Sequence, residues 1–280
     1  MHIFRAVFRA ENTPGGWSCA PVDGMALAAI PEVPRVKPFL ILQLRPETEA
    51  SDSEFAAFLD KGALGADEVI RVRLDQQALP RDLSLDDLSG IIVGGGPGCV
   101  SDAPADKDPV EARIEAAVLS LMPEVTGRDF PFLGCCYGIG ILGRHLNGEV
   151  SKAAYSEPVG TSACRVTQEG RDDPLLDGVP EVFEAFVGHK EAMQALPAGC
   201  VHLVASDPCP FQMLRHGDNV YATQFHPEAD AEGFETRINI YKHRGYFPPE
   251  RAEELIAMCR AADVQAPEKV LRNFVRRYRR

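Results

Sequence analysis

A cysteine stands in a motif typical of an exposed nucleophile. Cys136 lies in "GCCYG" (134–138), with glycines two positions before and two positions after it. This spacing is typical of a sharp strand-to-helix turn that presents a nucleophile above a sheet. The N-terminal end of the following helix is expected to favour the thiolate. Only Cys136 has both glycines, so we predict that it is the nucleophile and that Cys135 is the last buried residue of the strand.

A base and an orienting acid occur together about ninety positions later, in "QFHPEAD" (224–230). His226 and Glu228 are two residues apart, so in an extended chain their side chains lie on the same side. Pro227 between them restricts the backbone to that geometry. A carboxylate that accepts from one imidazole nitrogen leaves the other nitrogen to face the thiol. We therefore predict a Cys136–His226–Glu228 triad.

An acyl-transfer site also needs donors for the oxyanion. The backbone N–H of Tyr137 follows the nucleophile directly and is one predicted donor. The glycine corner "GGGPG" (94–98) is expected to supply the second donor from Gly96, where a bare backbone can approach a substrate carbonyl. This corner lacks the Gly-Lys-Ser/Thr ending of a phosphate-binding loop.

These motifs require an α/β sheet whose strands end near one another. Short apolar runs predict buried parallel strands, and intervening segments with helical spacing predict helices. In this half we predict strands at 39–44, 68–74, 90–98 and 130–134, and helices at 51–62, capped by Ser51 or Ser53, and at 108–122. Alternation of strands and helices indicates a mostly parallel, doubly wound sheet.

The second half is richer in β structure and then becomes helical. We predict strands at 162–168, 181–189 and 201–206, a hairpin at 211–226 that turns at 217–219, and helices at 233–243, 249–262 and 267–278. In all, we expect a peripheral N-terminal extension (1–37), an α/β domain (38–245) and a C-terminal helical appendage (246–280). The fold class is α/β, with a smaller antiparallel portion in the second half.

Composition excludes several classes of function. A net charge of −12 disfavours nucleic acid as a partner. The basic C-terminal segment "KVLRNFVRRYRR" (269–280) is an exception, but its apolar residues form one helical stripe that is typical of a helix docked on a core. No apolar run approaches the roughly 20 residues that span a bilayer, so no membrane role is predicted.

The cysteines argue for a reducing compartment. Eight cysteines are scattered without a CxxC or Cys/His zinc spacing, and the first residues lack the apolar core of a secretory signal. Free thiols in the cytoplasm are the expected state. We predict no metal and no cofactor.

At this point the sequence resembles a known family. "GGGPG", "GCCYG" and "QFHPE", in this order, are similar to the motifs of the class I (triad) glutamine amidotransferases, most of all to the amidotransferase domain of GMP synthase. "EPVG" (157–160) and "GHKEAMQALPAG" (188–199) are similar to two further segments of that domain. The resemblance covers about residues 38–230.

The resemblance implies a flavodoxin-like α/β fold and hydrolysis of the glutamine side-chain amide through a glutamyl thioester on Cys136. His226 would transfer protons, Glu228 would orient it, and Tyr137 and Gly96 would hold the oxyanion. Gly96, Gly98, His189 and Lys190 match positions that line the glutamine site. Nothing after residue 230 resembles an ATP-pyrophosphatase loop, so we expect a stand-alone amidotransferase whose synthetase or acceptor partner, if any, is a separate chain.

Three departures from the family pattern leave the substrate open. The family elbow usually continues to a glutamine that binds the substrate, and here that position is Gly140. The family's Ser-His-Gly turn is Gly188-His189-Lys190, and the opening "LQLRPETEASDSEF" (42–55) differs from that of GMP synthase. Hydrolysis of other γ-glutamyl amides on the same triad is one alternative, and a catalytically silent binding protein that keeps the fold is another.

Overall fold

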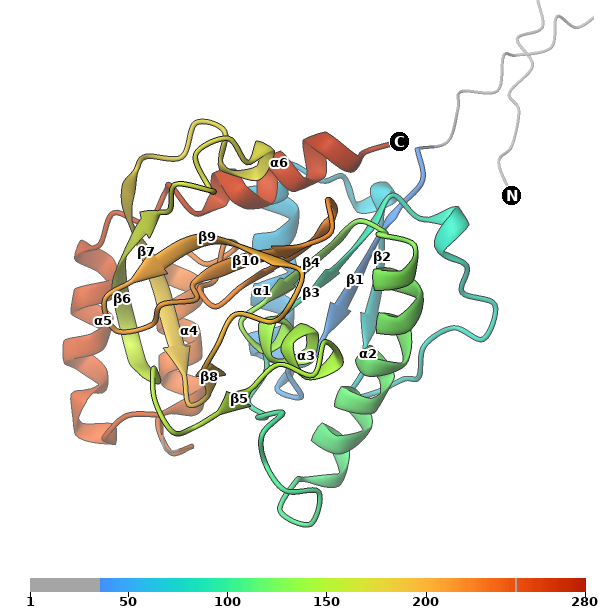
Figure 1. The fold of residues 1–280 in the computed structure, drawn as a ribbon. Helices are drawn as coiled ribbons and strands as arrows, with labels where there is room; N and C mark the ends of the chain where they lie inside the picture. Colours follow the sequence, from blue (N-terminus) through green and yellow to red (C-terminus); the bar gives the residue numbers. More distant parts are fainter. Residues whose placement is uncertain (1–35, 245) are drawn as a thin grey trace, which may run out of the picture. The chain divides into compact units, whose positions relative to one another are not determined.

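The fold is built on one nine-stranded sheet with the strand order β2-β1-β3-β4-β11-β10-β9-β6-β7 (Figure 1). The structure is a computed structural model, and it describes residues 36–244 and 246–280. Residues 1–35 lie outside this range, so most of the predicted extension is not tested. The first part of the strand order, 2-1-3-4, is that of flavodoxin-like sheets.

The parallel half of the sheet contains the strands that end at the site. They are β1 (Phe39–Gln43), β2 (Val69–Arg73), β3 (Gly90–Val93), β4 (Phe132–Cys135) and β11 (Val220–Thr223). Within this half, neighbouring strands pair in parallel. Four of the five are buried along their whole length, which explains why they appear in the sequence as short continuous apolar runs. Their carboxyl ends lie at one edge of the sheet.

The other half of the sheet is antiparallel. Its strands are β10 (Met213–His216), β9 (Cys200–Ser206), β6 (Glu157–Val166) and β7 (Val182–His189). β5 (Val150–Ser151) and β8 (Ala192–Met193) form a separate two-stranded antiparallel sheet. The predicted fold class, a mostly parallel sheet with an antiparallel portion in the second half, is confirmed.

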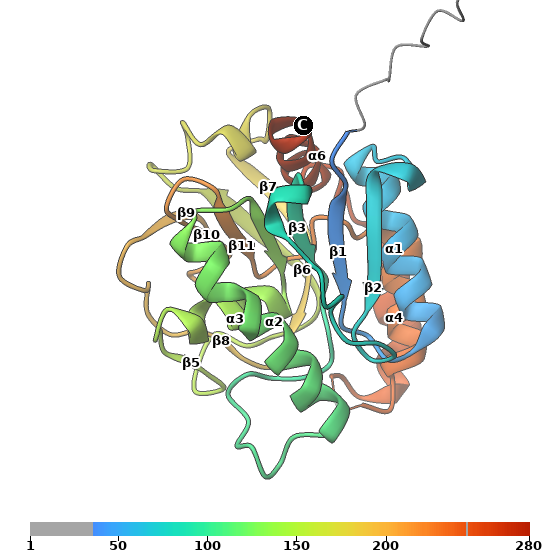
Figure 2. The same ribbon diagram turned by 90° about the vertical axis from the view of Figure 1, so that its right-hand side faces the viewer.

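Helices cover both faces of the sheet (Figure 2). α2 (Pro109–Gly127) and α3 (Tyr137–His145) pack on one face in a shared apolar core. α1 (Thr48–Gly62) and α6 (Glu268–Tyr278) pack on the other. α4 (Ala231–Tyr241) lies beside α1, and α5 (Ala252–Ala261) packs against α4 and β6. The apolar stripe of α6 is buried on the core, as predicted from its spacing.

All five predicted helices differ from their predicted bounds at one end or both, and α1 and α2 differ for a clear reason. α1 begins at Thr48, so both predicted caps, Ser51 and Ser53, lie inside the helix, and Ser51 is buried. Glu47 takes the capping position without a side-chain hydrogen bond. α2 continues through Pro123 to Gly127. Proline removes one helical hydrogen bond, but Val125 is fully buried in the core beyond it, and this packing holds the last turn in place.

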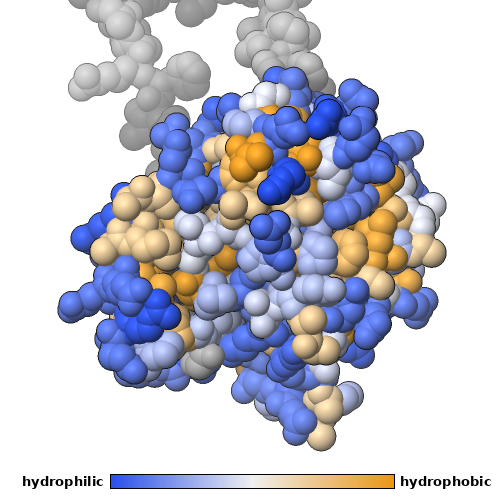
Figure 3. Space-filling model, turned by 60° about the vertical axis from the view of Figure 1, so that its left-hand side comes forward, coloured by the Kyte–Doolittle hydropathy of each residue, from blue (hydrophilic) through white to orange (hydrophobic). Residues whose placement is uncertain are grey.

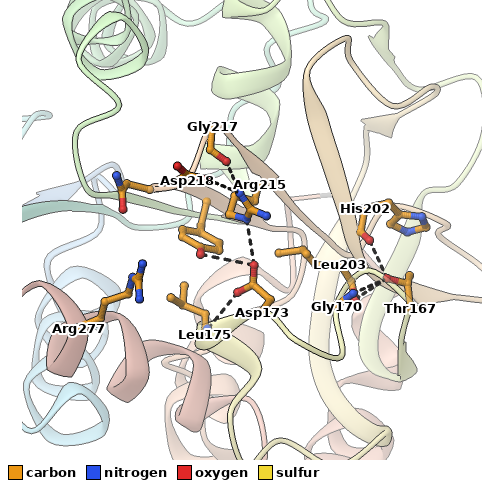
Figure 4. A network of polar contacts seen from close by, with 12 residues as sticks. Thr167, Gly170, Asp173, Leu175, His202, Leu203, Arg215, Gly217, Asp218 and Arg277 are labelled. Carbon is orange, nitrogen blue, oxygen red and sulfur yellow. Dashed lines mark hydrogen bonds and ion pairs between the residues drawn. The ribbon is translucent and has the colours of Figure 1, made fainter.

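The antiparallel half is tied together by a polar network around Asp173 (Figure 4). The Asp173 carboxylate accepts a hydrogen bond from the backbone N–H of Leu175 at 3.0 Å. It also forms an ion pair with Arg215 of β10 at 3.0 Å. Thr167 likewise donates to the carbonyl of His202 at 2.6 Å. These contacts fix the loop between β6 and β7 against β9, β10 and β11.

The surface mixes hydrophilic residues with separate apolar patches (Figure 3). In the part of the chain that is described, no helix is both long and apolar enough to cross a bilayer. All seven cysteines in that part are free thiols, and Cys19 lies outside it. The division at residue 245 stays a prediction.

Candidate active site

Cys136 sits on a strained turn between β4 and α3. Its backbone has φ 52° and ψ −90°, a conformation that residues with a side chain rarely adopt. The Cys136 N–H donates to the carbonyl of Thr223 at 2.7 Å, which ties the turn to the end of β11. Cys135 is fully buried in the core on the α1 and α6 face, as expected. The turn thus separates the two adjacent thiols onto different surfaces.

The two glycines of the turn are not equivalent. A Cβ on Gly134 would lie 2.9 Å from the backbone carbonyl carbon of Gly138, so a side chain has no room there. A Cβ on Gly138 would meet nothing nearer than Val93 at 3.8 Å, which is ordinary contact. Lack of space therefore requires glycine at Gly134 but not at Gly138.

This difference gives a matched pair of variants. We expect Gly134→Ala to lower the free energy of unfolding by about 1–3 kcal/mol, because backbone has to shift to relieve the overlap. Gly138→Ala should change it by less than half as much. Urea unfolding of both variants measures the difference, and equal losses would contradict the crowding described here.

His226 and Glu228 form a hydrogen-bonded pair at the end of β11. Nδ1 of His226 and Oε1 of Glu228 are 2.9 Å apart, and both side chains are buried. Arg237 of α4 donates to the same Glu228 oxygen at 2.8 Å. The carboxylate thus holds the imidazole on one side and is itself held by a buried guanidinium, so its orientation is fixed by two partners.

Cys136 and His226 line the same cavity, although no hydrogen bond joins the sulfur to the imidazole. Hydrogen bonds of this type commonly tighten only when a substrate is bound. Nδ1 is turned toward Glu228, which leaves Nε2 as the nitrogen available for proton transfer. The structure therefore brings the three predicted triad members into one place, and their catalytic roles stay predictions.

Burial sets the charges of these groups. It raises the pKa of the Cys136 thiol to about 12, and the nearby Arg45 guanidinium opposes it only in part. Burial also lowers the pKa of His226 below its ordinary 6.5, against the opposing charge of Glu228. Although burial acts to raise it, the pKa of Glu228 is held well below its ordinary range by His226 and Arg237. The predicted preference for a thiolate is wrong for this arrangement, because burial outweighs the partial charge of the helix end.

The glycine corner makes room for charged side chains. A Cβ on Gly94 would lie 2.4 Å from the carboxylate of Glu54, and one on Gly95 would lie 2.6 Å from Arg45 Nη2 and 2.7 Å from His226 Cε1. Glycine at Gly95 therefore lets Arg45 and the imidazole pack against the same stretch of backbone.

The two predicted oxyanion donors, Gly96 and Tyr137, line a cavity together with Cys136. Within the described residues, neither of their backbone N–H groups has a hydrogen-bond partner. For Tyr137 this follows from its position in the first turn of α3, where backbone N–H groups lack intrahelical acceptors. Both donors are thus available to an oxygen bound next to Cys136.

The predicted substrate positions line this same cavity, here called the Glu191-side cavity. Gly98, His189 and Lys190 are all part of its wall. Gly140 also lines it, and a Cβ there would lie 3.1 Å from Oε1 of Glu191. That carboxylate accepts hydrogen bonds from the backbone N–H groups of Val100 at 2.7 Å and Ser101 at 2.8 Å. Glu191 therefore fills the space next to Gly140.

Comparison with known proteins decides the family. Residues 62–240 match the family model described as glutamine amidotransferase class-I. The chain belongs to the class I glutamine amidotransferase family. The predicted family and enzyme class are thereby confirmed.

Curated relatives of this amidotransferase include GMP synthases. It is 31% identical over 170 residues to the GMP synthase [glutamine-hydrolyzing] of Thermosipho africanus, covering 58% of this chain and 29% of that one. It is 29% identical over 173 residues to that of Lactobacillus acidophilus, covering 60% of this chain and 30% of that one. The amidotransferase therefore spans less than a third of the length of either relative.

Solved structures agree on the fold. A glutamine amidotransferase from Thermotoga maritima superposes with a TM-score of 0.67 at 16% identity, over 86% of this chain and 98% of that one. A glutamine amido transferase from Methylobacillus flagellatus gives 0.63 at 21% identity, over 87% and 94%. At these identities the likeness concerns the fold alone.

The amidotransferase anchors its His189 turn through the imidazole. His189 Nδ1 contacts the Glu191 carbonyl at 2.9 Å, and Nε2 contacts Oε2 of Glu157 at 2.9 Å. Gln212 donates to the same Glu157 oxygen at 2.6 Å. Glu157, His189 and Cys209 lie close enough together to ligate an ion, but both ring nitrogens of His189 already have partners. The cluster is best explained as a buried anchor, and His189 lines the cavity from a fixed position.

Several residues of the site were missed in the sequence. Arg45 and Arg237 are buried beside the His226–Glu228 pair, and Tyr246 and Phe247 line the cavity next to His226. Tyr246 donates to the carbonyl of Pro97 at 3.1 Å, which holds the segment after α4 against the glycine corner. The one available signal was a charged residue, Arg45, directly after a buried strand.

Proposed function

We propose that the protein hydrolyses the side-chain amide of glutamine to glutamate and ammonia through Cys136, His226 and Glu228. The observation that carries the proposal is that a cysteine on a strained turn lines one cavity with a buried imidazole whose other nitrogen is held by a carboxylate. Membership of the class I glutamine amidotransferase family supports glutamine hydrolysis with ammonia transfer.

The chemistry follows from the resting charges. Because the thiol of Cys136 and the imidazole of His226 are both neutral, the proton moves from sulfur to Nε2 as the sulfur attacks the amide carbon. Glu228 stabilises the imidazolium that forms. The N–H groups of Tyr137 and Gly96 donate to the oxyanion. His226 then protonates the nitrogen, the C–N bond breaks, and water hydrolyses the thioester.

Glu191 is the proposed partner of the substrate's α-ammonium group. The family usually has a substrate-binding glutamine at the position of Gly140, but here the Glu191 carboxylate occupies the adjacent space. Its two backbone hydrogen bonds hold it in place inside the Glu191-side cavity. A fixed carboxylate is well suited to an ammonium group. Gly98, His189 and Lys190 would line the remainder of the amino-acid site.

The ammonia is proposed to pass to an acceptor bound by a separate synthetase subunit. The GMP synthase relatives are more than three times as long as the part that matches this chain. A partner that supplies an equivalent function would complete the reaction.

The direct test is to incubate the protein with glutamine and to measure glutamate and ammonia. We expect equal amounts of the two products. The assay is repeated with candidate acceptors and partner subunits present, because partners often activate such sites. Absence of glutamate under all of these conditions would contradict the proposal.

The pH dependence tests the role of His226. The imidazole must be neutral to accept the proton, and burial lowers its pKa below 6.5. We therefore expect kcat/KM for glutamine to be independent of pH from 7 down to about 6.5 and to fall tenfold per pH unit only at lower pH. An acid limb that begins above pH 6.5 would show that the protonated imidazole is favoured instead.

A second candidate function is hydrolysis of other γ-glutamyl amides on the same triad. It is favoured by a second cavity, which His226 lines and which shares Cys136 with the Glu191-side cavity. Glutamine itself leaves only ammonia, which needs little space. A panel of γ-glutamyl amides separates the two, and an exclusive preference for glutamine would remove this candidate.

A further inference from the structure

A second cavity adjoins the predicted base and is here called the His226-side cavity. Its lining includes Cys136 and His226, and also aromatic and aliphatic side chains from α4 and the segment after it. It offers about 40 Å³ to the centres of water-sized molecules, which is room for about three waters. In the proposed hydrolysis of glutamine, only Cys136, His226 and Gly96 of this lining take part.

Arg45 is the polar group of this cavity that the reaction does not use. Its side chain is 6% exposed, and its Nε donates to Oε1 of Glu54 at 2.9 Å. Among the described residues, Glu54 is the one that Arg45 reaches with a hydrogen bond of ordinary length, and its guanidinium also lies beside Tyr241, 5.6 Å from the ring centroid. Nη2 lies against Gly95, directly beside Cε1 of His226. A guanidinium whose terminal nitrogens have no carboxylate partner therefore lines the cavity together with the imidazole of His226.

The charges around Arg45 are balanced before any ligand binds. Glu54 pairs with Arg45, and Glu228 pairs with Arg237, so the four buried groups carry no net charge. A carboxylate in the cavity would therefore be bound by the directed N–H donors of Arg45 and not by an excess of positive charge. A guanidinium fork is geometrically matched to a carboxylate, which it binds through two parallel hydrogen bonds.

We propose that the His226-side cavity is a leaving-group subsite for the carboxylate of a small amino acid, and that the enzyme hydrolyses γ-glutamyl amino acids with glycine-sized leaving groups. In such a substrate the carboxylate is two bonds from the scissile nitrogen. The imidazole of His226 protonates this nitrogen, and Arg45 lies beside that imidazole. Arg45 is therefore well placed to bind the carboxylate. This inference rests on the proposed function, because it uses the same Cys136 and His226.

The reaction balances without any further reagent. The sulfur of Cys136 forms a bond to the γ-carbonyl carbon, the C–N bond breaks, and His226 transfers the thiol proton to the departing nitrogen. The amino acid leaves as a neutral amine with its carboxylate on Arg45. Water then hydrolyses the glutamyl thioester and restores the thiol.

The walls of the cavity limit the leaving group. Tyr241, Tyr246 and Phe247 form part of its lining, and Tyr246 is fixed by its hydrogen bond to Pro97. A CH₂–COO⁻ group has four heavy atoms, which is close to the space available. Amino acids with large side chains should therefore be poor leaving groups.

The test compares γ-glutamylglycine with γ-glutamylethylamide, which has a similar size but no carboxylate. Glutamine hydrolysis is measured in the same preparations. We expect the wild-type kcat/KM to be about tenfold or more higher for γ-glutamylglycine, as is typical of hydrogen bonds to a charged group. The ratio of the two values is the readout, because a general loss of activity cancels from it.

The variant is the double substitution Arg45→Gln with Glu54→Gln, which leaves neither buried charge without a partner. We expect the ratio to fall to about one. Arg45→Lys keeps the charge but loses the fork and should give an intermediate ratio. Arg244→Gln, which removes an arginine that is 64% exposed, is the matched control for long-range attraction and should leave the ratio unchanged.

A wild-type ratio near one, a ratio that the double substitution does not lower, or an equal fall in Arg244→Gln would overturn the subsite while glutamine hydrolysis stands. If the wild type hydrolyses neither glutamine nor either γ-glutamyl compound, the proposed function fails and the subsite with it. Unfolding curves of each variant confirm that the ratios come from folded protein.

Discussion

Replacing Cys136 by alanine should lower kcat for glutamine hydrolysis by about 10⁴-fold or more, the loss expected when a triad nucleophile is removed. The sulfur is the only group on the strained turn that can form the thioester, and both proposed oxyanion donors lie next to it. The measurement is glutamate release by the purified variant under the conditions that activate the wild type.

Cys135→Ala is the matched control for this experiment. Cys135 is the adjacent thiol, but it is buried in the core on the opposite surface of the turn. Its replacement should lower stability slightly through a small cavity and leave glutamate release within a fewfold of wild type. Substantial activity in Cys136→Ala, or a comparable loss in Cys135→Ala, would contradict the assignment of the nucleophile.

Replacing Glu228 by glutamine should lower kcat by about 10³- to 10⁴-fold, as expected for the orienting carboxylate of a triad. Oε1 of Glu228 holds Nδ1 of His226 at 2.9 Å and receives Arg237 at 2.8 Å. An amide in this place removes the charge that stabilises the imidazolium. It also no longer fixes which nitrogen of the neutral imidazole carries the proton. Glu232→Gln, an exposed acidic position at the start of α4, is the control and should be nearly silent.

The pH profile separates this role from a merely structural one. Glu228 raises the pKa of His226 against the lowering effect of burial. Without that charge the imidazole is harder to protonate, so the acid limb of kcat/KM in Glu228→Gln should move to lower pH. Loss of activity with an unchanged acid limb would mean that Glu228 only supports the fold. Circular dichroism and urea unfolding identify variants that do not fold.

Much of the site could be predicted from local patterns. The strand before Cys136 and the helix after it are adjacent in sequence, and His226 and Glu228 are separated by one residue, so their local geometry follows from short-range rules. The buried strands β1, β3 and β4 could be predicted in the same way, because each is a short apolar run, whereas β11 was predicted only as part of a hairpin. Their ends meet at one edge of the sheet, and that is enough to expect the Cys136 turn and the His226 pair to be neighbours.

The features of the site that the sequence did not predict depend on contacts between distant segments. Arg45 and Arg237 come from the end of β1 and from α4, and nothing in either stretch shows that both pack beside Glu228. The glycines at 94–96 indicated a close approach but not that its cause is the side chains of Glu54, Arg45 and His226. The thiolate was predicted from the helix end alone, because the burial that raises the pKa of Cys136 is a property of the packed core.

Acid quenching of the reaction with glutamine, followed by mass spectrometry of the peptide that contains Cys136, tests the central claim most directly. The account predicts one glutamyl group attached to Cys136, absent without glutamine and removed by hydroxylamine, as a thioester should be. Formation of glutamate with no acyl group on Cys136, or with the group on another cysteine, would contradict it.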